Sequence, residues 1–191
     1  EYVAVRVPKE EFVEAVDRLT ELGYQGLNCT VPLKEAAFAW CLSVDESSRR
    51  IGAINTLRPA TGEGTNTDRI GICRVVERCR PNWNRALILG AGGTARAVAV
   101  ALETGVLSLY NRTPSRARQL SIDTGIQADV LEHPAVKGFD LVVNCTSAGL
   151  HGENLRIDWS GADPRLLAVD MVYSKKPTPF VADALAHGIE A

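Results

Sequence analysis

A glycine-rich turn is the segment whose residue types point most directly to chemistry. It begins at Gly90, directly after the apolar run 86–89, and leads into a stretch typical of a helix. In such a turn the first glycine permits a tight bend, and Gly92 lets the backbone approach a pyrophosphate. Amides at the start of the helix and the helix dipole favour bound phosphate. We therefore predict a dinucleotide site formed by Gly90, Ala91, Gly92, Gly93, Thr94 and Ala95. The alternative, an ordinary glycine-rich turn, fits this context less well.

The end of the next predicted strand, 106–110, indicates which dinucleotide binds. An Asp or Glu at that position would hydrogen-bond the ribose 2′-hydroxyl of NAD. The chain instead has Asn111, Arg112 and Thr113, followed by Arg116. A guanidinium group can hold a 2′-phosphate in a charge-assisted fork, so the sequence favours NADP, with Arg112 the stronger candidate. Taken singly, either arginine would be interpreted as a solvated surface charge.

A lysine and an aspartate in the first half could handle protons. Lys34 closes the polar string 28–34, Asp68 lies in the string 64–71, and Asn55 stands between them. Open α/β sheets bind small molecules at strand ends and helix starts such as these. Oxidation of a hydroxyl group needs a proton acceptor, and a lysine beside a carboxylate can serve. Each residue alone has a simpler interpretation: a surface lysine, a helix N-cap or a turn residue.

The elements that must position these residues alternate between strands and helices. In the first half we predict strands at 2–7, 25–30 and 54–58, with helices at 9–22, 32–42 and 45–50. In the second half we predict helices at 68–80, 93–103 and 114–120, a last helix capped by Thr178, and strands at 86–89, 106–110, 140–144 and 166–170. This alternation favours an α/β protein with a doubly wound, parallel Rossmann-type lobe.

Composition excludes several other classes of protein. The net charge is −2, so nothing favours a nucleic acid or an anionic membrane as partner. No apolar run reaches the roughly eighteen residues of a membrane span. The five cysteines are dispersed and the three histidines lack ligand spacing. We therefore expect reduced thiols, a cytoplasmic location and no metal. The sequence leaves the oligomeric state open, with a homodimer as one option.

Several polar strings together resemble the shikimate dehydrogenase family in content and in order. The resemblance covers nearly the whole chain. The matching strings are Asn28–Lys34, Gly52–Thr56, Gly64–Gly71, Gly90–Ala97, Asn111–Thr113, Asn144–Gly149, Val169–Tyr173 and Lys176–Phe180.

The resemblance implies NADP-dependent, reversible reduction of 3-dehydroshikimate to shikimate, in the biosynthesis of aromatic amino acids. It implies that Lys34 exchanges the proton of the reacting hydroxyl and that Asp68 pairs with it. Thr30 and Asn55 would hold ring hydroxyls, and Tyr173 would close on the substrate. The residues implied near the nicotinamide are Thr146, Ser147, Gly149 and Met171.

The resemblance also implies two lobes: a substrate-binding (catalytic) α/β domain over 1–67 and an NADP-binding Rossmann-type domain over 68–191. Family members begin with a strand and a Ser-x-Ser string, and they end with a helix bearing a glutamine. Neither piece is in this sequence, so we expect a first lobe that lacks its first strand and its C-terminal helix, by truncation or because those residues lie outside the printed sequence. Two alternatives stay open: a quinate/shikimate dehydrogenase of the same family, and a non-catalytic regulatory relative that binds NADP or shikimate.

Overall fold

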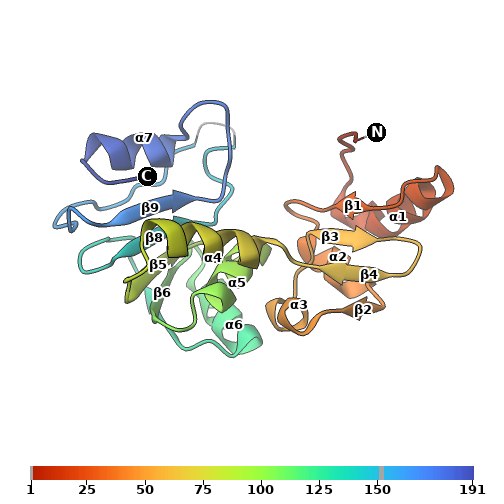
Figure 1. The fold of residues 1–191 in the computed structure, drawn as a ribbon, viewed down its shortest axis with the longest axis horizontal. Coiled ribbons are helices and arrows are strands. Elements are labelled where there is room, and N and C mark those ends of the chain that lie inside the picture. Colours follow the sequence, from red (N-terminus) through yellow and green to blue (C-terminus); the bar gives the residue numbers. More distant parts are fainter. Residues whose placement is uncertain (1, 151–152) are drawn as a thin grey trace. The chain divides into compact units, whose positions relative to one another are not determined.

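The chain folds into two compact units, 1–67 and 68–191 (Figure 1). The structure is a computed structural model, and it describes residues 2–150 and 153–191. None of the described helices is long and apolar enough to cross a membrane.

The first unit is a small mixed sheet with short helices. Its elements are η1 (Lys9–Glu11), α1 (Phe12–Glu21), β1 (Leu27–Asn28), α2 (Lys34–Trp40), β2 (Ser43–Val44), α3 (Glu46–Ile51), β3 (Thr56–Arg58) and β4 (Glu63–Thr65). The strand order is β1-β3-β4-β2, with β3 antiparallel to both of its neighbours and β2 parallel to β4.

The apolar face of α1 builds the core of this unit. Phe12 and Val16 are buried and pack with a cluster that includes Ala37, Ile54 and Leu57. Gly23 has φ +85°, the left-handed conformation expected just past a helix C-terminus. The predicted helix 9–22 therefore exists, although its first turn is a 3-10 helix.

The predicted strand at 2–7 is wrong. Residues 2–7 belong to no strand, and both Tyr2 and Val5 are largely exposed. Alternating apolar side chains are a weak guide here because a strand exists only where a neighbouring strand completes its hydrogen bonds. Within the described residues, no strand pairs with this segment.

The second unit is a five-stranded, all-parallel sheet with helices on both faces. Its elements are α4 (Asp68–Cys79), β5 (Arg85–Leu89), α5 (Gly93–Ala101), β6 (Val106–Tyr110), α6 (Pro114–Thr124), β7 (Ala128–Leu131), β8 (Leu141–Asn144), β9 (Leu167–Asp170) and α7 (Pro179–Ala186). The strand order is β7-β6-β5-β8-β9. The predicted doubly wound, Rossmann-type fold is confirmed.

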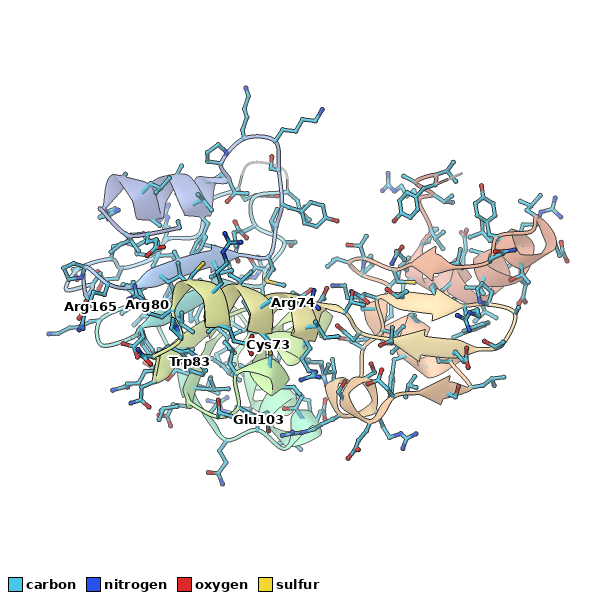
Figure 2. All side chains as sticks on the ribbon, in the orientation of Figure 1. Cys73, Arg74, Arg80, Trp83, Glu103 and Arg165 are labelled. Carbon is cyan, nitrogen blue, oxygen red and sulfur yellow. The ribbon has the colours of Figure 1, made fainter. Side chains whose placement is uncertain are left out.

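Alternate residues of the central strand, β5, pack into two separate cores, one on each face of the sheet. Ala86 and Ile88 pack with residues of α4, α5 and α6. Leu87 and Leu89 pack on the opposite face with Phe180 and other residues of α7 and its preceding loops. Cys73 of α4 also reaches the carbonyl of Ala101 at the end of α5 (Figure 2). Burial on both faces explains why this strand consists of consecutive apolar residues.

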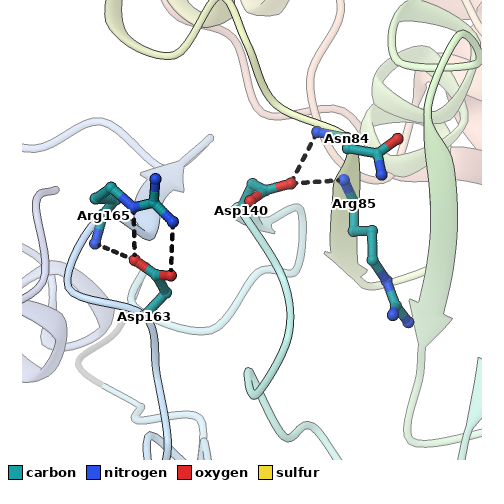
Figure 3. A network of polar contacts seen from close by, with 5 residues as sticks. All are labelled: Asn84, Arg85, Asp140, Asp163 and Arg165. Atoms are coloured by element: carbon teal, nitrogen blue, oxygen red, sulfur yellow. Dashed lines mark hydrogen bonds and ion pairs between the residues drawn. The ribbon is translucent and has the colours of Figure 1, made fainter.

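An aspartate fixes the start of β5 at the amino edge of the sheet. Asp140 Oδ2 accepts hydrogen bonds from the backbone amides of Asn84, at 2.8 Å, and Arg85, at 2.9 Å (Figure 3). Close to this edge, Arg165 forms a forked ion pair with Asp163. These contacts lie at the amino edge, whereas the loops that carry the predicted site lie at the opposite, carboxyl edge of the sheet.

Candidate functional site

The glycine turn follows β5, the strand at which the order of the sheet reverses: β6 and β7 lie on one side of β5, and β8 and β9 lie on the other. Gly90 follows β5, has φ +111°, and donates its amide hydrogen to the carbonyl of Tyr110 at 2.7 Å. A Cβ atom on Gly90 would lie 3.1 Å from the backbone carbonyl of Cys145, which follows β8, and 3.3 Å from Thr146 Cγ2. The turn and the loop after β8 therefore meet at the switch point of the strand order, the usual ligand site of such sheets.

The other residues of the turn leave room for a phosphate. A Cβ on Gly92 would meet nothing within 4 Å, and Gly92 is the N-cap of α5, with no side chain to cap the first turn. Ala95 is fully buried, as its place between helix and strand requires. Arg96 points elsewhere, since it pairs with Asp123 of α6. The hydrogen bond from Arg96 lowers the pKa of the Asp123 carboxyl.

Basic side chains follow the end of β6. Arg112 and Arg116 are exposed, and no carboxylate occurs between Asn111 and Arg116. Asn111 Nδ2 donates to the carbonyl of Thr113 at 2.9 Å, which shapes the turn into α6. Thr113 is the N-cap of α6, although its side chain makes no capping hydrogen bond. Both guanidinium groups are thus open to solvent beside the predicted adenosine end of the site.

A buried asparagine shapes the loop that faces the glycine turn. Asn144 is fully buried, and its Oδ1 accepts from the amide and the hydroxyl of Thr146 at 3.0 and 2.8 Å. Thr146 Oγ1 in turn accepts from the amide of Ala148 at 3.1 Å. Gly149 has φ +100°, which favours glycine, and Ser147 is exposed. The predicted residues Thr146, Ser147 and Gly149 therefore share one ordered loop.

In the first unit, backbone hydrogen bonds draw three predicted residues together. The amide of Ile54 donates to the carbonyl of Lys34 at 2.8 Å, so the start of α2 lies beside Asn55. The amide of Cys29 donates to the carbonyl of Asn55, also at 2.8 Å, which brings the chain just before Thr30 to the same place. Thr30 and Lys34, from the string 28–34, and Asn55, from a second segment, are thus drawn together.

The side chain of Asn55 is held in a fixed orientation. Its Nδ2 donates to Thr67 Oγ1 at 3.0 Å, and its Oδ1 accepts from the amide of Thr67 at 3.0 Å and from Thr56 Oγ1 at 3.1 Å. These bonds fix the chain up to the last residue of the first unit. Asp68, the first residue of α4, follows directly in the sequence.

Charge and burial around Lys34 affect a neighbouring thiol. The pKa of Cys29 is raised to about 11, mainly by burial and also by the nearby Cys41, while the Lys34 ammonium group partly opposes the rise. A raised pKa disfavours the thiolate, which is the nucleophilic form of a cysteine.

A cavity of about 110 Å³ lies in the first unit, between residues 2–7 and α1. Its lining is mainly apolar and includes Val5, Phe12 and Leu27. The lining contains none of Thr30, Lys34 and Asn55, but it reaches Cys29 and Leu33, so the cavity borders the polar string 28–34.

The pairing of Lys34 with Asp68 stays a prediction, because the two residues belong to different units. The approach of Tyr173 to the substrate is also untested; in the second unit its side chain is 96% exposed. Within residues 2–150 and 153–191, no group of three or more His, Cys, Asp or Glu side chains is placed to hold a metal ion.

Sequence reasoning missed several polar residues that organise the site. Asp45 joins α3 to β4, because its carboxylate accepts from Ser48 Oγ at 2.6 Å and from Thr65 Oγ1 at 2.8 Å. Asp170 connects Asn144 to Thr178 at the carboxyl edge of the parallel sheet. A polar residue that ends an apolar strand was the available signal for Asn144 and Asp170.

The strand order and the glycine turn at its switch point define a Rossmann-type dinucleotide-binding protein, carrying a second, smaller α/β unit. A family model described as the shikimate dehydrogenase substrate binding domain matches residues 1–57. The chain is 41% identical, over 100% of its length and 72% of the relative's, to the shikimate dehydrogenase (NADP(+)) of Acidiphilium cryptum. It is 40% identical to that of Brucella ovis, over 99% of the chain and 71% of the relative. The chain therefore belongs to the shikimate dehydrogenase family.

Solved structures agree with this assignment. Shikimate dehydrogenase from Aquifex aeolicus superposes with a TM-score of 0.84 at 30% identity, over 96% of this chain and 71% of that one. The Thermus thermophilus shikimate 5-dehydrogenase, in complex with NADP(H) and shikimate, gives a TM-score of 0.82 at 32% identity, over 96% and 72%.

Proposed function

We propose that this chain is an NADP-dependent shikimate dehydrogenase, which catalyses the reversible reduction of 3-dehydroshikimate to shikimate. One observation carries the proposal: the glycine turn after β5 closes against the loop after β8, in a chain about 40% identical to enzymes that bear this name. The first unit would bind substrate and the second NADP.

The residues of the second unit fit NADP. The space above Gly92 and the first turn of α5 suit a pyrophosphate, whereas a Cβ at Gly90 would lie only 3.1 Å from the Cys145 carbonyl. Arg112 and Arg116, with Asn111 and Thr113, would hold the 2′-phosphate. Thr146, Ser147, Gly149 and Met171 would lie along the nicotinamide. When bound, this cofactor supplies the hydride acceptor or donor.

The first unit supplies proton handling and substrate orientation. During oxidation, Lys34 Nζ would take the proton of the reacting hydroxyl, and Asp68 would stabilise the ammonium group that results. Thr30 and Asn55 would hydrogen-bond the ring hydroxyls, and Tyr173 would contribute from the second unit. Orientation by these side chains accounts for much of the rate, because it makes the reaction effectively unimolecular.

The test of this assignment is Lys34→Ala in the full chain, assayed with shikimate and NADP. We expect kcat to fall by about 10²–10⁴-fold because the proton acceptor is lost. The dissociation constant for NADP should change little, since Lys34 lies outside the second unit. Lys9→Ala, an exposed lysine of the same unit, is the matched control. Near-normal turnover by Lys34→Ala would contradict the assigned role.

The same assay with quinate and NAD tests the related activity. Quinate dehydrogenase from Corynebacterium glutamicum, solved with NAD, is 31% identical to this chain. We expect shikimate with NADP to be the preferred pair, because no carboxylate follows β6.

A cytoplasmic location is also proposed. It is supported by the five cysteines, all of which are free of disulfides. A homodimer is proposed as the assembly to test first, and light scattering on the full chain decides between one and two copies.

A further inference from the structure

Three polar side chains form one hydrogen-bonded network at the carboxyl edge of the parallel sheet. Asn144 ends β8 and is fully buried, Asp170 ends β9, and Thr178 is the N-cap of α7 and only 5% exposed. Asn144 Nδ2 donates to Asp170 Oδ1 at 2.9 Å, and the hydroxyl of Thr178 donates to Asp170 Oδ2. The network therefore ties together the ends of two strands and the start of a helix.

The carboxylate of Asp170 sets the direction of every bond in this network. An ionised carboxylate only accepts hydrogen bonds, so Asn144 must turn its NH₂ toward Asp170 and its Oδ1 toward Thr146. Thr178 donates its proton to Asp170, and its oxygen then accepts from the amide of Val181 at 3.3 Å. The orientation of each partner follows from one charged group.

Two loops of the proposed cofactor and substrate site depend on these bonds. Asn144 Oδ1 holds the amide and the hydroxyl of Thr146, whose methyl carbon lies close to Gly90. Asp170 Oδ1 also accepts from the amide of Val172 at 2.9 Å, and the amide of Met171 donates to the carbonyl of Asn144 at 2.9 Å. The network thus fixes both the loop 145–149 and the segment that begins at Met171 and leads to Tyr173.

We propose that Asp170 is a positioning residue of the reaction, which holds the loops 145–149 and 171–178 in the arrangement that hydride transfer needs through Asn144 on one side and Thr178 on the other. The inference rests on the proposed function, because it takes Thr146, Met171 and Tyr173 as residues near the reacting atoms. Asp170 itself acts only through its neighbours.

Asp170→Asn tests the inference with the least change in shape. An amide offers one acceptor and one NH₂ donor, so it cannot accept on both sides as the carboxylate does. We expect kcat with shikimate to fall by about 10- to 100-fold, since displacement of reacting groups by about 1 Å can cost this much. KM for shikimate should rise, whereas the dissociation constant for NADP should stay within about threefold, because the glycine turn and Arg112 are untouched.

Asp140→Ala is the control for a purely structural loss in the same unit. Asp140 accepts two backbone hydrogen bonds at the amino edge of the sheet, and alanine removes both. Its variant should keep kcat within about twofold of the wild type even where its Tm falls. Equal losses of activity in the two variants, in step with Tm, would show a structural role and overturn the inference.

A second pair of variants keeps the test valid if Asp170→Asn fails to fold. Thr178→Val removes the hydroxyl at nearly constant shape, and Thr178→Ser keeps it. We expect the valine variant to lose turnover and the serine variant to recover most of it, and equal activity of the two would refute the proposal. Wild-type protein that binds NADP but oxidises no shikimate would instead overturn the proposed function itself.

Discussion

Two glycines of one turn have different physical roles at the residue scale. Gly90 needs its glycine for the fold, because it has φ +111° and a Cβ there would press on the Cys145 carbonyl. Gly92 has ordinary backbone angles and open space around it, so the fold does not require a glycine there. We propose that the absence of a side chain at Gly92 admits a ligand, whereas the glycine at position 90 serves the fold.

The contrast predicts opposite results for two alanine variants. Gly90→Ala should lower the free energy of unfolding by about 1–3 kcal/mol, because the left-handed conformation and the close approach are both unfavourable. Gly92→Ala should leave this free energy nearly unchanged but weaken NADP binding. Urea unfolding and NADP titration measure the two effects. A Gly90→Ala protein as stable as the wild type would show that the turn can relax.

We propose that the exposed guanidinium group of Arg112 contributes most to the preference for NADP over NAD. Arg112→Asp removes the charge that would pair with the 2′-phosphate and places a carboxylate near the ribose. Affinity for NADP should fall by at least about tenfold, and affinity for NAD should fall much less or rise. Arg118→Asp, an exposed arginine of the following helix α6, controls for the change in net charge. Equal losses for both nucleotides would disprove the 2′-phosphate assignment.

At the scale of elements, helices and strands could be predicted where residues within or next to the segment mark its position. The helices α4 and α7 and the strand β6 fall where predicted, since apolar spacing, Thr178, Pro179 and Gly188 mark them locally. The strands β2, β4 and β7 were missed. They are short and mostly half-exposed, so only their pairing with neighbours defines them.

The site was predictable to the same extent. Motif residues such as Gly90 and Arg112 could be proposed from the sequence, because the residues beside them indicate the end of a strand and a turn. The network of Asn144, Asp170 and Thr178 joins residues up to 34 positions apart in the numbering, and no local pattern reports such a contact. Long-range hydrogen bonds are therefore the part of the site that only the structure supplies.

The cap of α3 gives a prediction at the element scale. Burial tends to raise the pKa of Asp45, but hydrogen bonds from Ser47, Ser48 and Thr65 outweigh it and hold the pKa below its usual value. The pKa in the folded state is thus depressed, so the stabilisation is present above the unfolded-state pKa of about 3.9 and is lost as pH falls through the folded-state value.

Asp45→Ala should lower the free energy of unfolding by about 1 kcal/mol at pH 7, the usual value of an N-cap. The difference from the wild type should be largest above about pH 4 and shrink below it, as Asp45 becomes protonated. Urea unfolding at pH 7 and pH 3 measures this, with Asp17→Ala, an exposed aspartate of α1, as control. A difference that stays constant between the two pH values would rule out the ionised cap as its source.

At the scale of the whole molecule, the two units differ in how much buried apolar core each has to stabilise it alone. The second unit has a sheet of five parallel strands with a buried apolar cluster on each face. The first unit has one small cluster and strands of two or three residues. Short chains bury too little apolar surface to offset the entropy of folding, so this unit is the less able of the two to fold alone.

Residues 68–191 expressed alone should therefore unfold cooperatively and bind NADP nearly as well as the full chain, because all of the proposed cofactor residues lie within it. They should not oxidise shikimate, since Lys34, Thr30 and Asn55 are absent. Calorimetry and NADP titration test this, and the Arg112→Asp form of the fragment is the control for specific binding. Failure of the fragment to bind NADP, despite cooperative unfolding, would mean that the first unit contributes to the cofactor site. In that case residues before Asp68 would bind part of the nucleotide, and the assignment of NADP binding to the second unit alone would be wrong.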